Sequence, residues 1–149
     1  MRLRRISWEE MFNALKEIVS RIPKDYYVVV GIGSSGLIPA SIVCKLLKCR
    51  EFYTLSIKLY DEGKPPRRIS EKPLVLAQFI PDLSGRKVIL VDDLASSGET
   101  MRTAKRIVKR AGASEVISIV LVKKRKCKEK IDYFYLETDD CPIFPWDSS

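Results

Sequence analysis

Two adjacent carboxylates, Asp92 and Asp93, end an apolar run at residues 88–91 and are followed by a turn of small residues and a helical pattern. A continuous apolar run of this length is typical of a buried strand. Because unpaired charges are costly where a strand leaves a core, the two acids need bound partners. Carboxylates accept hydrogen bonds from hydroxyl groups and also ligate hard metal ions. We therefore interpret the doublet and the turn together as one site.

The turn after the acids has the composition of a phosphate-binding loop. Small residues and Gly98 allow successive backbone amides to point inward as an anion nest, and the following helix adds the positive end of its dipole. Ser96, Ser97 and Thr100 supply hydroxyl donors, but the lysine of a Walker A loop is absent. A phosphate beside acids that bind hydroxyls indicates a sugar phosphate with a vicinal diol. The alternative is an ordinary strand–turn–helix with an acidic cap.

The elements around this site predict an α/β fold with an open, mostly parallel twisted sheet and helices on both faces, in one domain over residues 1–149. Strands are expected over residues 26–32, 52–58, 87–91, 116–122 and 131–136. Helices are expected over residues 7–22, from a first turn that contains Pro39 to Leu47, and over residues 99–111. Ser7 and Glu10 form a capping box for the first helix, whose apolar side would include Trp8 and Phe12. Strands that lack polar alternation and are separated by helices indicate a parallel sheet covered on both faces.

The segments with unusual chemistry all follow strands of this predicted sheet. They are residues 33–36 (GSSG), 58–61 (KLYD), 92–100 (DDLASSGET) and 123–126 (KKRK). Ligands of open parallel sheets bind beyond the carboxyl ends of the strands. All four segments are therefore expected at the one edge of the sheet where a ligand would bind. Residues 61–73 have almost nothing to bury and are expected to form a mobile loop.

Composition excludes several kinds of chemistry. The chain of 149 residues contains no histidine, which excludes Ser-His-Asp and Cys-His nucleophile systems. The four cysteines form no C-x-x-C pair, so a zinc site is not expected, and Cys44 fits a helix core. The sequence shows no signal-peptide pattern and no apolar run long enough to span a membrane. A cytoplasmic protein without a membrane partner is therefore expected.

The formal net charge of +8 indicates either a phosphorylated or polyanionic ligand or simply a solvated basic surface. The densest basic run, residues 123–130, has no interleaved aromatic residues. Because the basic residues are not gathered into an arm along the sequence, a nucleic-acid partner is not expected.

The stretch VILVDDLASSGETM, residues 88–101, resembles the phosphoribosyl pyrophosphate (PRPP) signature of type I phosphoribosyltransferases. Residues 31–47, GIGSSGLIPASIVCKLL, are similar to the pyrophosphate loop and helix of the purine branch, which contains xanthine-guanine phosphoribosyltransferase and archaeal relatives. The ending DYFYLETDDCPIFPWD, residues 132–147, resembles the C-terminal base-binding segment of that branch. The resemblance thus covers most of the chain.

The resemblance implies transfer of phosphoribose from PRPP to a 6-oxopurine, which gives a nucleoside monophosphate and pyrophosphate in purine salvage. Asp92 and Asp93 would hold the ribose hydroxyls, with Asp93 beside Mg²⁺, and Ser96 would complete the catalytic set. The implied 5′-phosphate loop is Ala95, Ser96, Ser97, Gly98, Glu99 and Thr100. The family also implies a homodimer or higher homo-oligomer.

The other subsites follow from the same resemblance. The implied pyrophosphate loop is Gly33, Ser34, Ser35 and Gly36. Residues 124–149 would form the base-binding segment, and residues 61–73 would close over the reaction. Lys123 would donate to the exocyclic oxygen of the purine, while Ile143 and Phe144 would contact its ring.

Three departures from the family pattern leave alternatives open. The tryptophan that often stacks on the purine is replaced near Cys141, which leaves Ile143 and Phe144 as candidates. The loop aspartate that handles the purine N7 proton is matched here by Ser96, and the arginine of the pyrophosphate loop is matched by Ser34. Enzymes that use adenine typically lack that aspartate, although a lysine at position 123 argues against adenine. A non-catalytic PRPP or nucleotide sensor on the same fold is the other alternative.

Overall fold

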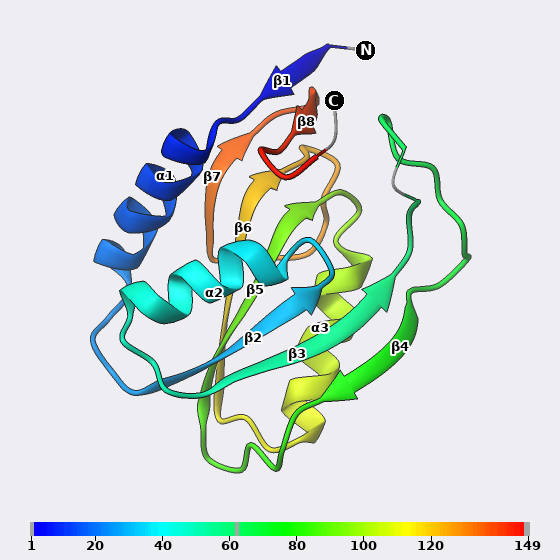
Figure 1. The fold of residues 1–149 in the computed structure, drawn as a ribbon. Helices are drawn as coiled ribbons and strands as arrows, with labels where there is room; N and C mark the ends of the chain where they lie inside the picture. The colour runs from blue at the N-terminus through cyan, green and yellow to red at the C-terminus, as the bar shows by residue number, and fades with distance from the viewer. Residues whose placement is uncertain (1, 62, 148–149) are drawn as a thin grey trace.

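The structure is a computed structural model that describes residues 2–61 and 63–147. Its centre is a twisted sheet of six strands in the order β4–β3–β2–β5–β6–β7 (Figure 1). The strands are β2 (Tyr27–Gly33), β3 (Phe52–Lys58), β4 (Leu74–Phe79), β5 (Lys87–Ala95), β6 (Glu115–Lys123) and β7 (Tyr133–Glu137). Neighbouring strands are parallel except β3 and β4, which are antiparallel. The predicted fold class is therefore confirmed.

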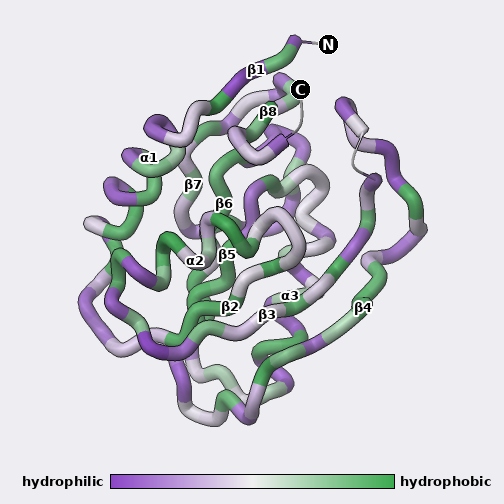
Figure 2. The backbone as a smooth tube through the Cα atoms, viewed as in Figure 1, coloured by the Kyte–Doolittle hydropathy of each residue, from purple (hydrophilic) through white to green (hydrophobic). Residues whose placement is uncertain are grey.

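Helices cover both faces of this sheet. The helices α1 (Trp8–Arg21) and α2 (Leu37–Leu46) pack on one face, and α3 (Glu99–Arg110) packs on the other (Figure 1). Successive residues of β2 serve opposite faces, since Val29 joins the core under α1 and α2 while Val28 and Val30 join the core under α3. Figure 2 shows hydrophobic residues concentrated along the central strands. Burial on both faces explains why these strands lack polar alternation.

The start of α1 follows the prediction only in part. Ser7 Oγ accepts from the Glu10 amide at 3.0 Å, so Ser7 is the expected cap. The Glu10 carboxylate does not return to the cap, because it binds the Arg4 guanidinium and accepts from the Tyr135 hydroxyl at 2.5 Å. These contacts tie α1 to β7. On the apolar side of α1, Trp8 and Phe12 remain 53% and 41% exposed.

Three short strands were not predicted. The strand β4 lies at the edge of the main sheet, and β1 (Leu3–Arg5) pairs in parallel with β8 (Cys141–Ile143) in a separate two-stranded sheet. The second pair ties the beginning of the described chain to the C-terminal segment. Cys44 is buried on α2, as predicted. Within the described residues, none of the helices combines the length and apolar character needed to cross a membrane.

Candidate active site

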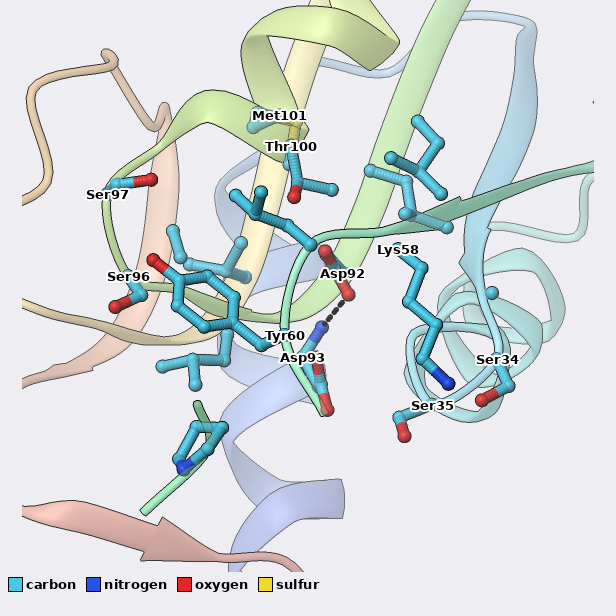
Figure 3. A pocket seen from close by; sticks show the side chains of 18 of the residues that line it. Ser34, Ser35, Lys58, Tyr60, Asp92, Asp93, Ser96, Ser97, Thr100 and Met101 are labelled. Carbon is cyan, nitrogen blue, oxygen red and sulfur yellow. Dashed lines mark hydrogen bonds between the residues drawn. The ribbon is translucent and has the colours of Figure 1, made fainter. Parts of the chain in front are cut away.

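A pocket opens where β2, β3 and β5 end, beyond their carboxyl ends. Its wall contains residues 32–35 after β2, residues 56–61 around the end of β3, and residues 92–98 with Thr100 and Met101. Lys64, Pro66, Leu76, Val120 and Asp147 also line it. Three of the four segments predicted to converge at this edge therefore line one pocket (Figure 3). The fourth, residues 123–126, is not part of the pocket wall.

The acidic doublet lies in the pocket wall at the end of β5. The Asp93 amide donates to Asp92 Oδ1 at 2.8 Å, which holds the first carboxyl against the backbone (Figure 3). Burial and the neighbouring charge of Asp93 raise the pKa of Asp92 well above its usual range. Burial also raises the pKa of Asp93, although the Lys64 ammonium acts in the opposite direction. Two carboxyl groups with raised pKa values favour a cation or hydroxyl donors beside them.

Gly36 brings the loop after β2 into close contact with this doublet. A Cβ atom at Gly36 would lie 2.3 Å from the Ile32 carbonyl oxygen and 2.7 Å from Asp92 Oδ1. A Cβ at Gly33 in the same loop would meet nothing closer than 3.4 Å. Only one of the two loop glycines is therefore required by packing.

Gly36→Ala is expected to destabilise the protein by about 1–3 kcal/mol, because the new methyl group must displace backbone or the Asp92 carboxyl. Gly33→Ala is the matched control and should cost much less. Urea unfolding of both variants measures the difference. Equal stabilities for the two variants would contradict the close approach of Gly36 to Asp92.

The predicted phosphate loop contains one residue in the left-handed region, as an anion nest does. Gly98 adopts φ +93° just before α3, and a Cβ there would lie 2.6 Å from Glu129 Cβ. Both the backbone conformation and the lack of space therefore favour glycine at this position. Ser97 Oγ accepts from the Glu99 amide at 3.3 Å and donates to Glu99 Oε2 at 2.9 Å. Ser96, Ser97 and Thr100 all line the pocket, whereas Glu99 does not.

The Glu99 carboxylate is bound by an arginine of the loop over residues 63–73. The Arg68 guanidinium donates to both carboxylate oxygens of Glu99, at 2.7 and 3.0 Å. Arg68 and Ser97 together lower the pKa of Glu99 to about 2. Because its charge is compensated by Arg68, Glu99 can contribute its backbone amide to an anion site without repelling the anion.

A second ion pair ties the same loop to the C-terminal segment. Lys64 Nζ lies 3.1 Å from Asp147 Oδ2, and Asp147 Oδ2 also accepts from the Phe144 amide at 2.8 Å. Lys64, Pro66 and Asp147 are part of the pocket wall, and they were predicted only as members of the loop over residues 61–73 and the segment over residues 124–149. The loop is thus attached to the phosphate-loop side by Arg68 and to the predicted base segment by Lys64.

Exposed ion pairs contribute only about 0.2–1 kcal/mol each, so the two contacts still allow the loop to open. We expect residues 63–73 to exchange amide hydrogens quickly in the free protein and to be protected when PRPP and a base analogue are bound. Arg68→Gln should raise exchange in the free loop several-fold. Arg67→Gln is the control, because the Arg67 side chain is 87% exposed and lies 3.7 Å from Asp61. Strong protection of the loop in the free protein would contradict its predicted mobility.

Lys58 and Tyr60 are site residues that sequence reasoning placed at this edge without giving them a role. In Figure 3 the Lys58 ammonium is directed toward Ser34 and Ser35, and the Tyr60 ring lies between the acidic doublet and Ser96. Both residues come at the end of β3, beside the loop after β2. In the sequence, Lys58 ends the apolar run of β3 and Tyr60 follows two residues later.

The predicted base-binding residues are not brought to the pocket wall. Lys123 Nζ lies 2.7 Å from Glu137 Oε2 and 5.6 Å from the centroid of the Phe134 ring. Phe144 is 2% exposed and stacks on Trp146, with ring centroids 4.9 Å apart. Ile143 ends β8 and is partly exposed. Of the C-terminal segment, Asp147 reaches the pocket.

Comparison with known proteins agrees with this architecture. Residues 4–149 match the phosphoribosyl transferase domain, and the chain belongs to that family. The chain is 29% identical over 95% of its length to a xanthine-guanine phosphoribosyltransferase of Cereibacter sphaeroides, 85% of which is covered. It is also 34% identical over 72% of its length to the transcriptional regulator GfcR of Archaeoglobus fulgidus, 53% of which is covered.

A solved structure gives the same result for the fold. The purine phosphoribosyltransferase of Pyrococcus horikoshii superposes with a TM-score of 0.85 at 25% identity, covering 100% of this chain and 97% of that one. The fold is therefore that of the type I phosphoribosyltransferases, as the resemblance of residues 88–101 predicted.

Proposed function

We propose that this protein transfers phosphoribose from PRPP to a 6-oxopurine base (hypoxanthine, guanine or xanthine), releasing pyrophosphate. The observation that carries the proposal is the union of three subsites in one pocket: the acidic doublet, the phosphate loop and the loop after β2. The doublet provides acceptors for a diol, and the phosphate loop provides donors for a monoester. The purine enzymes among its relatives support the choice of a purine acceptor.

The donor set also fits magnesium. Asp92 and Asp93 offer hard oxygen ligands whose raised pKa values are lowered again by a nearby cation. Mg²⁺ is commonly held by one or two carboxylates together with substrate oxygens, so Asp93 and the oxygens of PRPP suffice. When bound, the ion would neutralise charge on the departing pyrophosphate.

The residues of the pocket then divide the reaction between them. The bond from C1′ to the pyrophosphate oxygen breaks, a bond from C1′ to the purine nitrogen forms, and the purine proton passes to water or to the departing pyrophosphate. Asp92 and Asp93 orient the ribose through its hydroxyls. The Lys58 ammonium and the hydroxyls of Ser34 and Ser35 are placed to stabilise the leaving group, where the family arginine is missing.

Base recognition requires a change of partner at Lys123. Its ammonium is bound to Glu137 and must turn from that carboxylate to reach an exocyclic oxygen. An ammonium donates to a keto oxygen but offers no acceptor to an amino group, which favours a 6-oxopurine over adenine. The Lys64–Asp147 ion pair joins the loop over residues 63–73 to the segment that would hold the base, so the two would close over the base together.

A regulator is the second candidate. The 34% identity to GfcR and the absence of an acid at Ser96 favour a protein that binds PRPP or a nucleotide without turnover. Adenine remains the alternative acceptor.

A turnover assay with PRPP, Mg²⁺ and a panel of adenine, hypoxanthine, guanine and xanthine separates these candidates. Turnover of a 6-oxopurine alone supports the proposal, whereas turnover of adenine alone would overturn the argument from Lys123. Tight binding of PRPP or a nucleotide without turnover of any base would identify a sensor.

We also propose that the chain forms a homodimer or higher homo-oligomer. Phe12 of α1 and Ile42 and Leu46 of α2 line an apolar hollow on the surface, and the exposed Trp8 belongs to the same helix as Phe12. Exposed apolar patches of this kind commonly serve as interfaces. Light scattering on Phe12→Glu, compared with the unchanged chain, tests this assignment; an unchanged oligomer mass would exclude the α1–α2 surface.

A further inference from the structure

Two basic segments that are separate in the sequence lie against each other in the fold. One is α3, and the other is the segment over residues 124–130 that follows β6. Lys105 Nζ donates to the Lys130 carbonyl at 2.6 Å and to Glu129 Oε2 at 2.8 Å, and the Lys128 amide donates to the Ser97 carbonyl at 3.2 Å. The two segments are separated in the sequence by residues 111–123, so only the run over residues 123–130 stands out there as basic.

Together these segments form a surface with a large excess of positive charge. Its two acids are already compensated, since Glu99 binds Arg68 and Glu129 binds Arg102 and Lys105. Arg125 and Lys130 bind Asp139 and Asp132, and the remaining exposed cations are Arg106, Lys109, Arg110, Lys126 and Lys128. Across residues 2–61 and 63–147, none of these five has a carboxylate within 4.0 Å. We call these five residues the α3 basic surface.

We propose that the α3 basic surface binds the phosphate backbone of double-stranded nucleic acid without regard to sequence. Three arginines or lysines, Arg106, Lys109 and Arg110, recur at helical spacing on the outer side of α3, where they can follow a line of phosphates. Arginine is well suited to phosphate because its guanidinium donates two parallel hydrogen bonds. This inference revises the expectation that nucleic acid is not a partner.

The composition of the surface distinguishes this partner from two others. A membrane-bound helix needs exposed apolar side chains, but Met101, Ala104 and Val108 of α3 point into the core. Binders of single strands stack bases on aromatic side chains, and neither α3 nor residues 124–130 contain an aromatic residue. A row of cations without apolar or aromatic groups matches an intact duplex backbone.

The test is fluorescence anisotropy of a labelled 20-base-pair DNA duplex, titrated with the full chain at several salt concentrations. We expect binding in the micromolar range at 50 mM salt, with a log–log salt slope of about −0.9 per phosphate contacted. The triple variant Arg106→Gln, Lys109→Gln, Lys128→Gln should weaken binding at least tenfold. It should also reduce the slope by about 2–3 units, because three phosphate contacts are lost.

A matched control removes the same charge elsewhere. Lys16→Gln, Lys24→Gln and Lys48→Gln are exposed positions in or just after α1 and α2, the helices on the opposite face of the sheet. This variant should retain duplex binding, and both variants should retain PRPP binding, because none of the six residues lines the pocket. The outcome therefore does not depend on the proposed transferase activity.

Three results would overturn the proposal. Equal losses in the two triple variants would show attraction by net charge alone. Tighter binding to phosphatidylserine vesicles or to single-stranded DNA than to the duplex would assign a different partner. Absence of salt-dependent duplex binding at 50 mM would exclude the surface altogether.

Discussion

Replacing Asp92 and Asp93 by asparagine is expected to make the free protein more stable while weakening PRPP binding far more than tenfold. Each carboxylate lost from the ribose hydroxyls removes a charge-assisted hydrogen bond worth about 1.5–3 kcal/mol. The fold should persist because asparagine is nearly isosteric with aspartate. Calorimetry with PRPP and Mg²⁺ measures the affinity, and an unchanged affinity in the double variant would refute the assignment of the doublet.

The gain in stability follows from the direction of the pKa shifts. Folding raises the pKa of both acids, so the folded state holds their protons more tightly than the unfolded chain. Stability therefore falls as pH rises above the ordinary aspartate pKa of 3.8, and at neutral pH the doublet is destabilising. Asparagine removes this cost. The free double variant should consequently melt at a higher temperature than the unchanged protein at pH 7, with a smaller difference at pH 4.

Asp82→Asn is the matched control, since its pKa shift has the opposite sign. The Ser84 hydroxyl and amide donate to Asp82 Oδ1 and lower the pKa of that carboxyl. Its charge therefore favours folding at neutral pH, and its removal should lower the melting temperature slightly. A lower melting temperature in the doublet variant as well would mean that the two acids are already compensated in the free protein.

Lys123→Ala is expected to reduce turnover of a 6-oxopurine strongly while leaving PRPP affinity nearly unchanged. A site built around a buried donor discriminates strongly between ligands that pair with it and ligands that do not. Lys126→Ala is the control, because Lys126 is an exposed lysine of the adjacent segment. Steady-state kinetics with each base, combined with PRPP calorimetry, separate the two effects. A parallel loss of PRPP affinity would place Lys123 outside base recognition.

Ser96→Asp should act in the opposite direction. Ser96 lines the pocket beside the doublet, at the position where the family pattern has an acid. General acid–base assistance typically contributes about 10²–10⁴-fold, so restoring the carboxylate should raise the rate with a 6-oxopurine. Ser35→Asp controls for added charge in the same pocket. A rate that stays unchanged in Ser96→Asp would indicate that another group already handles the N7 proton.

The sequence predicted the buried parts of the fold well. The strand over residues 52–58 was predicted with the bounds it has, and β5 was predicted four residues short because its apolar run ends at the acids. The continuous apolar runs were informative because both faces of these strands are covered. The strand β4 was missed since most of its residues are exposed and it follows a loop with few apolar residues.

The pocket was predicted where local sequence determines local geometry. The doublet and phosphate loop are consecutive residues of one strand–turn–helix unit, so their proximity required no knowledge of the tertiary fold. The contacts of Lys64 with Asp147 and of Lys123 with Glu137 join distant segments and could not be read from spacing. The same limit applies to the α3 basic surface.

The exposed edge of the sheet has a consequence for behaviour at high concentration. Leu74, Leu76 and Phe79 of β4 are 45%, 62% and 68% exposed, and this edge strand could pair with strands of other molecules. Pro73 and Pro81 flank β4 closely, and neither can donate a backbone hydrogen bond. An invading strand therefore finds a ladder of only a few residues between two prolines. The edge limits the growth of intermolecular sheets by its length, even though its surface is apolar.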